Sequence, residues 1–315
     1  MTDGFRSIVV GVDLGAHGEA LSEGSEHALS QARLVAERFG ASLRFVHSTR
    51  DDEHWEDDRG EFVRKEPLAD GGRAVLHDVV ESLRVAGIDA SLELSDDHPA
   101  VAIADAVGRA GAELAIVGKR TSRSRDGRRL GSIARAVIHD CPSAVWVVHP
   151  EAGIRPALIL AAVDLSLVGE RVVVHAAAVA EAFGAELHLV HAQQLPISVQ
   201  LGRDADEAKW LQKGKSDAEE QLRDWLDGAS AQLHVGLTSP SQAVLSGEKQ
   251  LEPDLVVMGT VSEKQLEPDL VVMGTVSRGG APRLILGNTA ERLLSRLDTS
   301  LLVIKPPSPA TPGPR

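Results

Sequence analysis

The sequence predicts two tandem α/β domains, each a doubly wound sheet of five parallel strands with helices on both faces. Three observations lead to this prediction. The chain has 315 residues, about the length of two ordinary domains. Short apolar runs alternate with stretches of helical periodicity, which is typical of parallel sheets. The same landmarks also recur in the same order in the two halves of the chain.

Four pairs of matching segments carry this repeat. They are SIVVGVDL (7–14) with ALILAAVDL (157–165), AERFGASLRFVHS (36–48) with AEAFGAELHLVHA (180–192), AELAIVGKR (112–120) with PDLVVMGTV (268–276), and SAVWVVHP (143–150) with TSLLVIKPP (299–307). Helical spacing lies between them, so each half is expected to contain five strands in the flavodoxin-like order 3-2-1-4-5. We expect domains at 1–150 and 151–305, and a disordered Pro-rich tail at 306–315.

One segment interrupts the second half. EKQLEPDLVVMGTVS is present at 248–262 and again, without a single change, at 263–277. One domain needs only one strand here. The second copy runs directly into the glycine-bearing loop, so we expect residues 270–273 to form the sheet strand. The alternative is that residues 255–258 form it and the second copy loops out.

Composition restricts the class of protein. Apolar residues make up 43% and aromatic residues only 3%, so the cores must consist of Val, Leu, Ile and Ala. A net charge of −13 argues against a nucleic-acid partner. A single cysteine, Cys141, excludes disulfides and multi-cysteine metal sites, and we expect it to be a small buried residue. Neither a signal peptide nor a membrane-spanning run is recognisable, so we expect a cytoplasmic protein.

Two segments of the chain are rich in charged residues. The acidic stretch 49–61 is expected to be a solvated loop. The segment 204–227, with Trp210, Leu222 and Leu226 among its apolar residues, is expected to be an amphipathic helix that covers the sheet.

The candidate binding site lies where the first and fourth strands of each half end. Ligands of open parallel sheets bind at the carboxyl ends of the strands, where the strand order reverses. The first strands end at Asp13 and Asp164. The loops after the fourth strands are GKRTSRSRDGRRLGS (118–132) and GTVSRGGAPRLILGN (274–288). Glycine permits close backbone approach to a phosphate, and a helix start offers free N–H groups to it. The first loop is also rich in basic residues, from Lys119 and Arg120 to Arg129, which favours an anionic ligand.

These residues resemble the universal stress protein family in its tandem two-domain form. The family's motif is Gly-x2-Gly-x9-Gly followed by Ser, Thr or Asn, and the resemblance covers nearly the whole chain twice. It implies ATP, with Mg²⁺, as the cofactor. The implied binding residues are Asp13, Val46, Gly118, Arg120, Gly131, Ser132, Asp164, Val190, Gly274, Arg278, Gly287 and Asn288. Both loops depart from the motif at its second glycine, which is Thr121 in one and Ser277 in the other.

Three functional hypotheses stay open. The first is a stress-response protein that binds a nucleotide or another small anionic ligand in a regulatory or protective role, with at most slow ATP hydrolysis. The second is an interaction protein with vestigial pockets. The third is an enzyme that acts on a nucleotide. Single-domain relatives commonly dimerise through the last strand, so the resemblance implies that 145–148 pairs with 301–304 within the chain. A homodimer of the whole chain is a further expectation.

Overall fold

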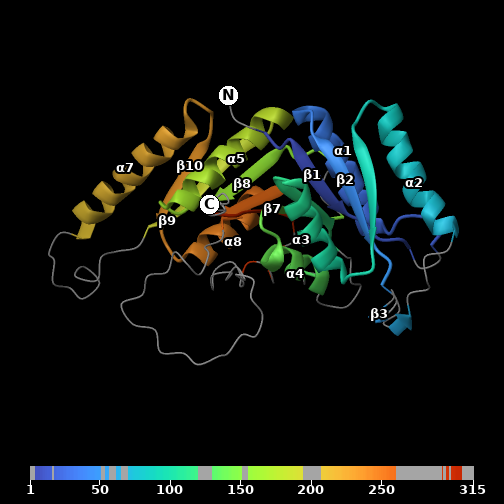
Figure 1. Ribbon diagram of the computed structural model, residues 1–315. Helices are drawn as coiled ribbons and strands as arrows, with labels where there is room; N and C mark the ends of the chain where they lie inside the picture. Colours follow the sequence, from blue (N-terminus) through green and yellow to red (C-terminus); the bar gives the residue numbers. More distant parts are fainter. Residues whose placement is uncertain are drawn as a thin grey trace, which may run out of the picture.

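The architecture is a ten-stranded sheet that runs through the whole molecule, with helices on both of its faces (Figure 1). It is known from a computed structural model. The structure describes residues 4–15, 18–50, 54–56, 62–64, 70–119, 130–150, 155–193, 207–259, 293, 296–297 and 299–306.

The strand order confirms the predicted topology in both halves. The first half contains β1 (Ser7–Gly11), β2 (Ser42–Ser48), β5 (Ala90–Ser95), β6 (Leu114–Gly118) and β7 (Ala144–Val148), in the order β5-β2-β1-β6-β7. The second contains β8 (Leu158–Ala162), β9 (Glu186–Gln193), β10 (Gln232–Leu237), β11 (Leu255–Gly259) and β12 (Ser300–Ile304), in the order β10-β9-β8-β11-β12. All pairs within each half are parallel. Each half therefore has the order 3-2-1-4-5.

The helices divide between the two faces of this sheet. One face carries α1 (Glu23–Phe39), α2 (Asp70–Val85), α5 (Leu167–Phe183) and α7 (Glu207–Leu226), and the other carries α3 (Pro99–Ala110), α4 (Ser132–Asp140) and α8 (Pro240–Leu251). Each of α1 and α5 ends at a glycine in the left-handed conformation, Gly40 with φ 67° and Gly184 with φ 65°. Glycine adopts this conformation without the steric penalty that a Cβ would cause, so the helix stops are dictated by sequence.

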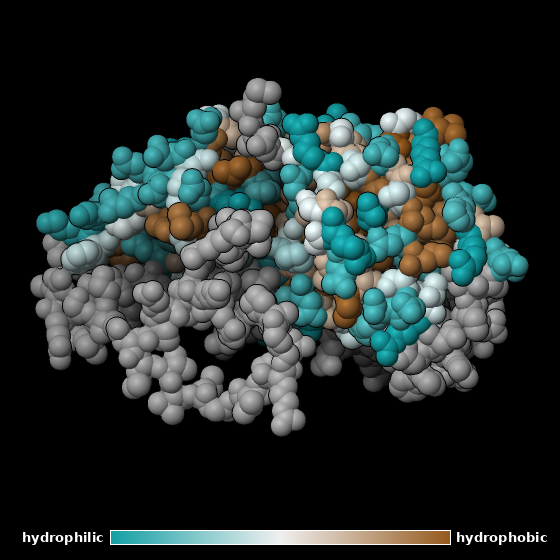
Figure 2. Space-filling view, in the orientation of Figure 1, coloured by the Kyte–Doolittle hydropathy of each residue, from teal (hydrophilic) through white to brown (hydrophobic). Residues whose placement is uncertain are grey.

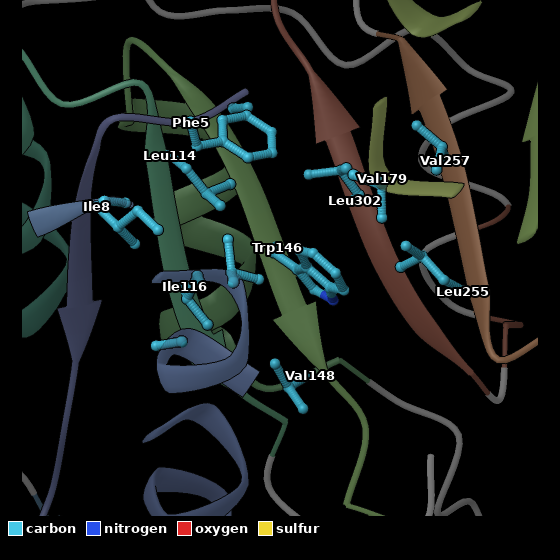
Figure 3. Packing of buried hydrophobic residues seen from close by; sticks show 14 of the residues in the cluster. Phe5, Ile8, Leu114, Ile116, Trp146, Val148, Val179, Leu255, Val257 and Leu302 are labelled. Atoms are coloured by element: carbon cyan, nitrogen blue, oxygen red, sulfur yellow. The ribbon is translucent and has the colours of Figure 1, made fainter. Parts of the chain in front are cut away.

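The two halves join through their last strands, as expected. β12 pairs antiparallel with β7, and Leu302 lies opposite Trp146. The close-up shows Trp146 beside this junction, among side chains from both halves (Figure 3). Trp146 is buried, and one apolar cluster continues from β1 through β7 and β12 to β11. Because this cluster is shared, the halves pack as one body.

Two buried lysines add polar contacts across the same junction. Lys119, after β6, donates from Nζ to the carbonyl oxygen of Leu297 at 3.3 Å. Lys305, after β12, donates to the carbonyl oxygen of Ile138 near the end of α4. The residue four positions after Ile138 is Pro142, which has no N–H, so this carbonyl has no helical donor. Lys305 replaces that donor from the other half of the chain.

The helix α7 confirms the amphipathic cover predicted for 204–227, with one exception. Ala218, Leu222 and Leu226 form its buried face. Trp210, which we expected on that face, is 43% exposed. The outer side of α7 is mostly hydrophilic in the space-filling view (Figure 2). Among the described residues, none of the helices is both long and apolar enough to cross a membrane.

Two sequence predictions are wrong. The sheet strand of the duplicated segment is Leu255–Gly259 in the first copy, and not residues 270–273, which lie outside the described part of the chain. The two copies have the same sequence, so no local preference could distinguish them. The acidic stretch 49–61 is also not entirely loop, because β3 (His54–Glu56) pairs antiparallel with β4 (Phe62–Arg64).

Candidate functional site

The candidate site of the first half lies at the carboxyl ends of β1 and β6. These strands are neighbours, but the chain continues from β1 towards β2 and from β6 towards β7, in opposite directions across the sheet. The helices that follow, α1 and α4, cover opposite faces of the sheet. The connections after the two strands therefore diverge. Between them a crevice forms, and doubly wound proteins bind their ligands in a crevice at this place.

Asp13 is held at the rim of this crevice by a set of short contacts. Its backbone N–H donates to the buried Ser25 Oγ at 2.7 Å, and its Oδ1 accepts from the N–H of Leu14 at 2.9 Å. His47, at the end of β2, is fully buried, and its Nδ1 lies 3.0 Å from the carbonyl oxygen of Val12. The Asp13 side chain itself is 46% exposed. The backbone of Asp13 is thus fixed, and its carboxylate can accept hydrogen bonds from a ligand.

The second half repeats this arrangement. In the first half, Val12 donates its N–H to the carbonyl of Val46 at 3.0 Å, and in the second half Val163 donates to Val190 at 2.9 Å. His191 Nδ1 then lies 2.9 Å from the Val163 carbonyl oxygen, as His47 does from that of Val12. The Val-His pair at the end of the second strand therefore has a positional role: it ties the loop that bears the aspartate to the neighbouring strand.

The two aspartates differ in their nearest partners. Asp164 Oδ1 accepts from both the N–H and the hydroxyl of Ser166, at 3.3 and 2.5 Å. Ser166 is the N-cap of α5, which begins only three residues after Asp164, whereas α1 begins ten residues after Asp13. Asp164 thereby contacts the start of its own helix, whereas Asp13 Oδ1 accepts from Leu14 and lies 3.9 Å from His47 Nδ1.

The strand-ending glycine, Gly118, has a structural role of its own. A Cβ at Gly118 would lie 2.0 Å from the carbonyl oxygen of Gly24 in the first turn of α1. Backbone cannot yield to such a contact, so Gly118 allows α1 to pack against the end of β6. At the corresponding place in the second half, a Cβ at Gly259 would lie 2.5 Å from Val168 Cγ1. This glycine is explained by helix packing, whether or not a ligand is bound.

Gly131 is different, because the fold does not require a glycine there. Its φ of −60° and ψ of 155° suit any residue, and no atom of the described residues lies within 4 Å of where its Cβ would be. Gly131 caps α4 with no side-chain hydrogen bond, and Ser132 at the first helical position is exposed. The start of α4 therefore has backbone N–H groups without a side-chain cap, at the positive end of its helix dipole.

Several predicted site residues fall outside the described part of the chain. These are Arg120, Gly274, Arg278, Gly287 and Asn288, together with the two motif departures Thr121 and Ser277. Lys119 is described, but it is buried and contacts the second half of the chain, so it does not belong to the basic lining that we expected. Of the predicted residues of the first half, Asp13 follows β1, Val46 lies near the end of β2, Gly118 ends β6, and Gly131 and Ser132 stand at the start of α4. Sequence reasoning missed Ser25 and Gly24, because their roles depend on how α1 enters the fold.

One other hollow could hold a ligand, but its lining is mainly apolar. Beneath α8, a hollow is lined by Leu160, Val190, His234, Ala243, Ser246, Gly247, Gln250 and Leu251. It faces the body of β8 and β9 with mainly apolar groups, whereas the crevice lies at the strand ends. Within the described ranges, no group of three or more His, Cys, Asp or Glu side chains is arranged to hold a metal ion.

Comparisons with known proteins agree with this architecture. The chain is similar along 95% of its length to a universal stress protein from Archaeoglobus fulgidus DSM 4304, with 19% identity, 98% of that chain covered and a TM-score of 0.66. A functionally unknown protein from Pseudomonas aeruginosa PAO1 is 21% identical over 97% of this chain and 94% of its own, with a TM-score of 0.67. No curated protein sequence matches significantly.

The fold and the repeated strand-end crevices define a tandem α/β protein of the doubly wound class. The sequence profile of the universal stress protein family matches residues 4–149, 158–267 and 261–305. The chain belongs to this family. The second and third matched segments overlap at 261–267, inside the duplicated segment.

Proposed function

We propose that this protein binds an adenine nucleotide, with ATP and Mg²⁺ as the first candidate, in the crevice of its first half, and that it acts as a regulatory or protective module in the stress response. The proposal is carried by two groups that follow neighbouring strands: the half-exposed carboxylate of Asp13 after β1, and the start of α4, the helix that follows β6. The Asp13 carboxylate accepts hydrogen bonds, which suits the hydroxyl and amino groups of a nucleoside. The N–H groups at the start of α4 suit phosphate oxygens, and Mg²⁺ would enter with the phosphates.

Membership of the family supports the stress-response role, and the single cysteine and the lack of a membrane-spanning helix in the described ranges are compatible with the cytoplasmic location that we retain in the proposal. The contacts described above assign no nucleophile or general base, so we propose binding with at most slow hydrolysis and not rapid turnover. A homodimer of the whole chain stays a prediction. The last strands, through which we expected pairing, are already used within the chain.

A glycine substitution tests the first crevice. Gly131→Val adds a side chain where no atom of the described residues lies within 4 Å, so the protein should stay folded, with a loss of about 1 kcal/mol for the weaker N-cap. The same side chain would occupy the approach to the α4 N–H groups. We expect wild-type protein to bind Mg-ATP in isothermal titration calorimetry and Gly131→Val to lose at least tenfold in affinity.

The matched control is Gly108→Ala in α3, another glycine with no atom within 4 Å of its added Cβ. It should stay folded and keep wild-type affinity. A wild-type protein that gives no binding heat and no thermal shift with Mg-ATP would remove the proposal. The vestigial-pocket alternative would then be tested by Thr121→Gly with Ser277→Gly, since binding that appears only in this variant would show that the native chain has lost the ligand.

A further inference from the structure

The β11 position is filled by residues that the chain possesses twice. Leu255, Val256 and Val257 are fully buried there, and Met258 is 4% exposed. Their backbones pair with β8 on one side and with β12 on the other. All of these residues lie in the segment 248–262, which recurs unchanged at 263–277.

The contacts that fix the entry and exit of this strand are duplicated as well. Asp254 Oδ2 accepts from the N–H groups of Ala157 and Leu158, at 2.8 and 3.0 Å. Thr299 Oγ1 donates to the carbonyl oxygen of Pro253 at 2.7 Å. At the exit, Gly259 leaves room for Val168 of α5. Residues 268–274 contain the same Pro, Asp, apolar run and Gly in the same order.

We propose that the two copies compete for this position, so that residues 268–274 replace Pro253–Gly259 in a fraction of the molecules. Identical side chains in one position make identical contacts, so the packing energy of the two arrangements is the same. The natural exchange point is Glu252, where α8 ends in a left-handed conformation with φ 49°. A switch at this residue keeps α8 intact and changes only where the 15 surplus residues are placed.

Loop lengths then determine the ratio of the two arrangements. With the first copy in place, three residues join α8 to the strand and 33 separate the strand from Leu293, the next residue that the structure describes, which is buried; with the second copy, these lengths are 18 and 18. If closure probability falls as the −3/2 power of loop length, the first arrangement is favoured about sixfold. This agrees with the first copy being the one in the structure. It leaves about a seventh of the molecules with the second copy in the sheet.

Aspartate substitutions test the exchange without any ligand. Val257→Asp places a charge at a fully buried position, so a chain that can use only the first copy loses its second half. If the copies are interchangeable, Val257→Asp and Val272→Asp each unfold within about 5 °C of the wild-type Tm, and the double variant loses cooperative unfolding of the second half. The control is Val257→Asp in a chain that lacks residues 263–277. This chain should lose cooperative unfolding of the second half, as the double variant does. The proposal is overturned if Val257→Asp loses cooperative unfolding of the second half as the double variant does, while Val272→Asp unfolds like wild type.

Thiol labelling gives an independent measure. The native cysteine is buried, so the background is low. Met258→Cys should react with a maleimide in about a seventh of the molecules or more, because the second copy displaces it. Complete protection of Met258→Cys with full reaction of Met273→Cys would contradict the exchange.

Discussion

Replacing Lys305 with methionine should change the way in which the free energy of unfolding depends on pH. Lys305 is 2% exposed, and burial lowers the pKa of its ammonium group from 10.5 to about 8, against smaller opposing effects of Cys141 and Asp140. Each tenfold change in proton affinity is worth about 1.4 kcal/mol, so charging this buried group costs roughly 3 kcal/mol relative to the unfolded chain.

The sign follows from proton binding in the two states. Between pH 8 and pH 10.5 the unfolded lysine holds its proton while the folded one releases it, so the contribution of Lys305 to stability rises with pH in this window. Lys305→Met cannot titrate here. The hydrogen bond that it loses, to Ile138, affects the variant by about the same amount at both ends of the window.

Urea unfolding from pH 7 to pH 10.5 provides the assay. The unfolding free energy of wild type minus that of Lys305→Met should rise by about 3 kcal/mol across the window. Lys213→Met, on the exposed face of α7, serves as the control and should give a constant difference. If the difference between wild type and Lys305→Met also stays constant, the pKa of Lys305 is not lowered by burial, and the reasoning is refuted.

Two further predictions follow from the contacts of single residues. Gly118→Ala should destabilise the protein by several kcal/mol in urea unfolding, because its Cβ would lie 2.0 Å from a backbone oxygen of α1. Gly131→Ala should change the free energy of unfolding by at most about 1 kcal/mol. Equal effects of the two substitutions would contradict the different roles of these glycines. His234 should make the second half less stable in acid. Burial and the neighbouring His188, whose Nδ1 lies 2.9 Å from His234 Nε2, lower the His234 pKa, so the folded state resists a proton that the unfolded state accepts as pH falls below about 6.5. In His234→Gln, the loss of Tm between pH 7.5 and pH 5 should be smaller than in wild type, and an unchanged loss would contradict this reasoning.

Much of the fold could be predicted because local signals and the repeat agree. The apolar runs, the glycines at 40 and 184 and the doubled order of landmarks all indicate the same alternation of strands and helices, and the structure has it twice. The pairing of β7 with β12 was accessible only through the family resemblance. Nothing in the local pattern of either strand specifies the partner across the junction.

The site was less predictable, because glycines of one motif can be present for unrelated reasons. Gly118 makes room for a helix, whereas Gly131 has no described atom within 4 Å of an added Cβ. The lysine contacts were also missed. Pro142 indicates that a carbonyl near the end of α4 lacks its helical donor, but only the assembled junction shows that Lys305 supplies one. The choice between the two copies had no sequence signal at all, because their residues are identical.

The antiparallel pairing of β7 with β12 has a geometric consequence for the two crevices. Within the large sheet, the strands of the first half point one way and those of the second half point the other, so their carboxyl ends lie at opposite borders of the sheet. The two crevices therefore face away from each other. A partner that covers one border of the sheet contacts one crevice only and leaves the other accessible. Any coupling between the crevices has to pass through the packed junction at Trp146.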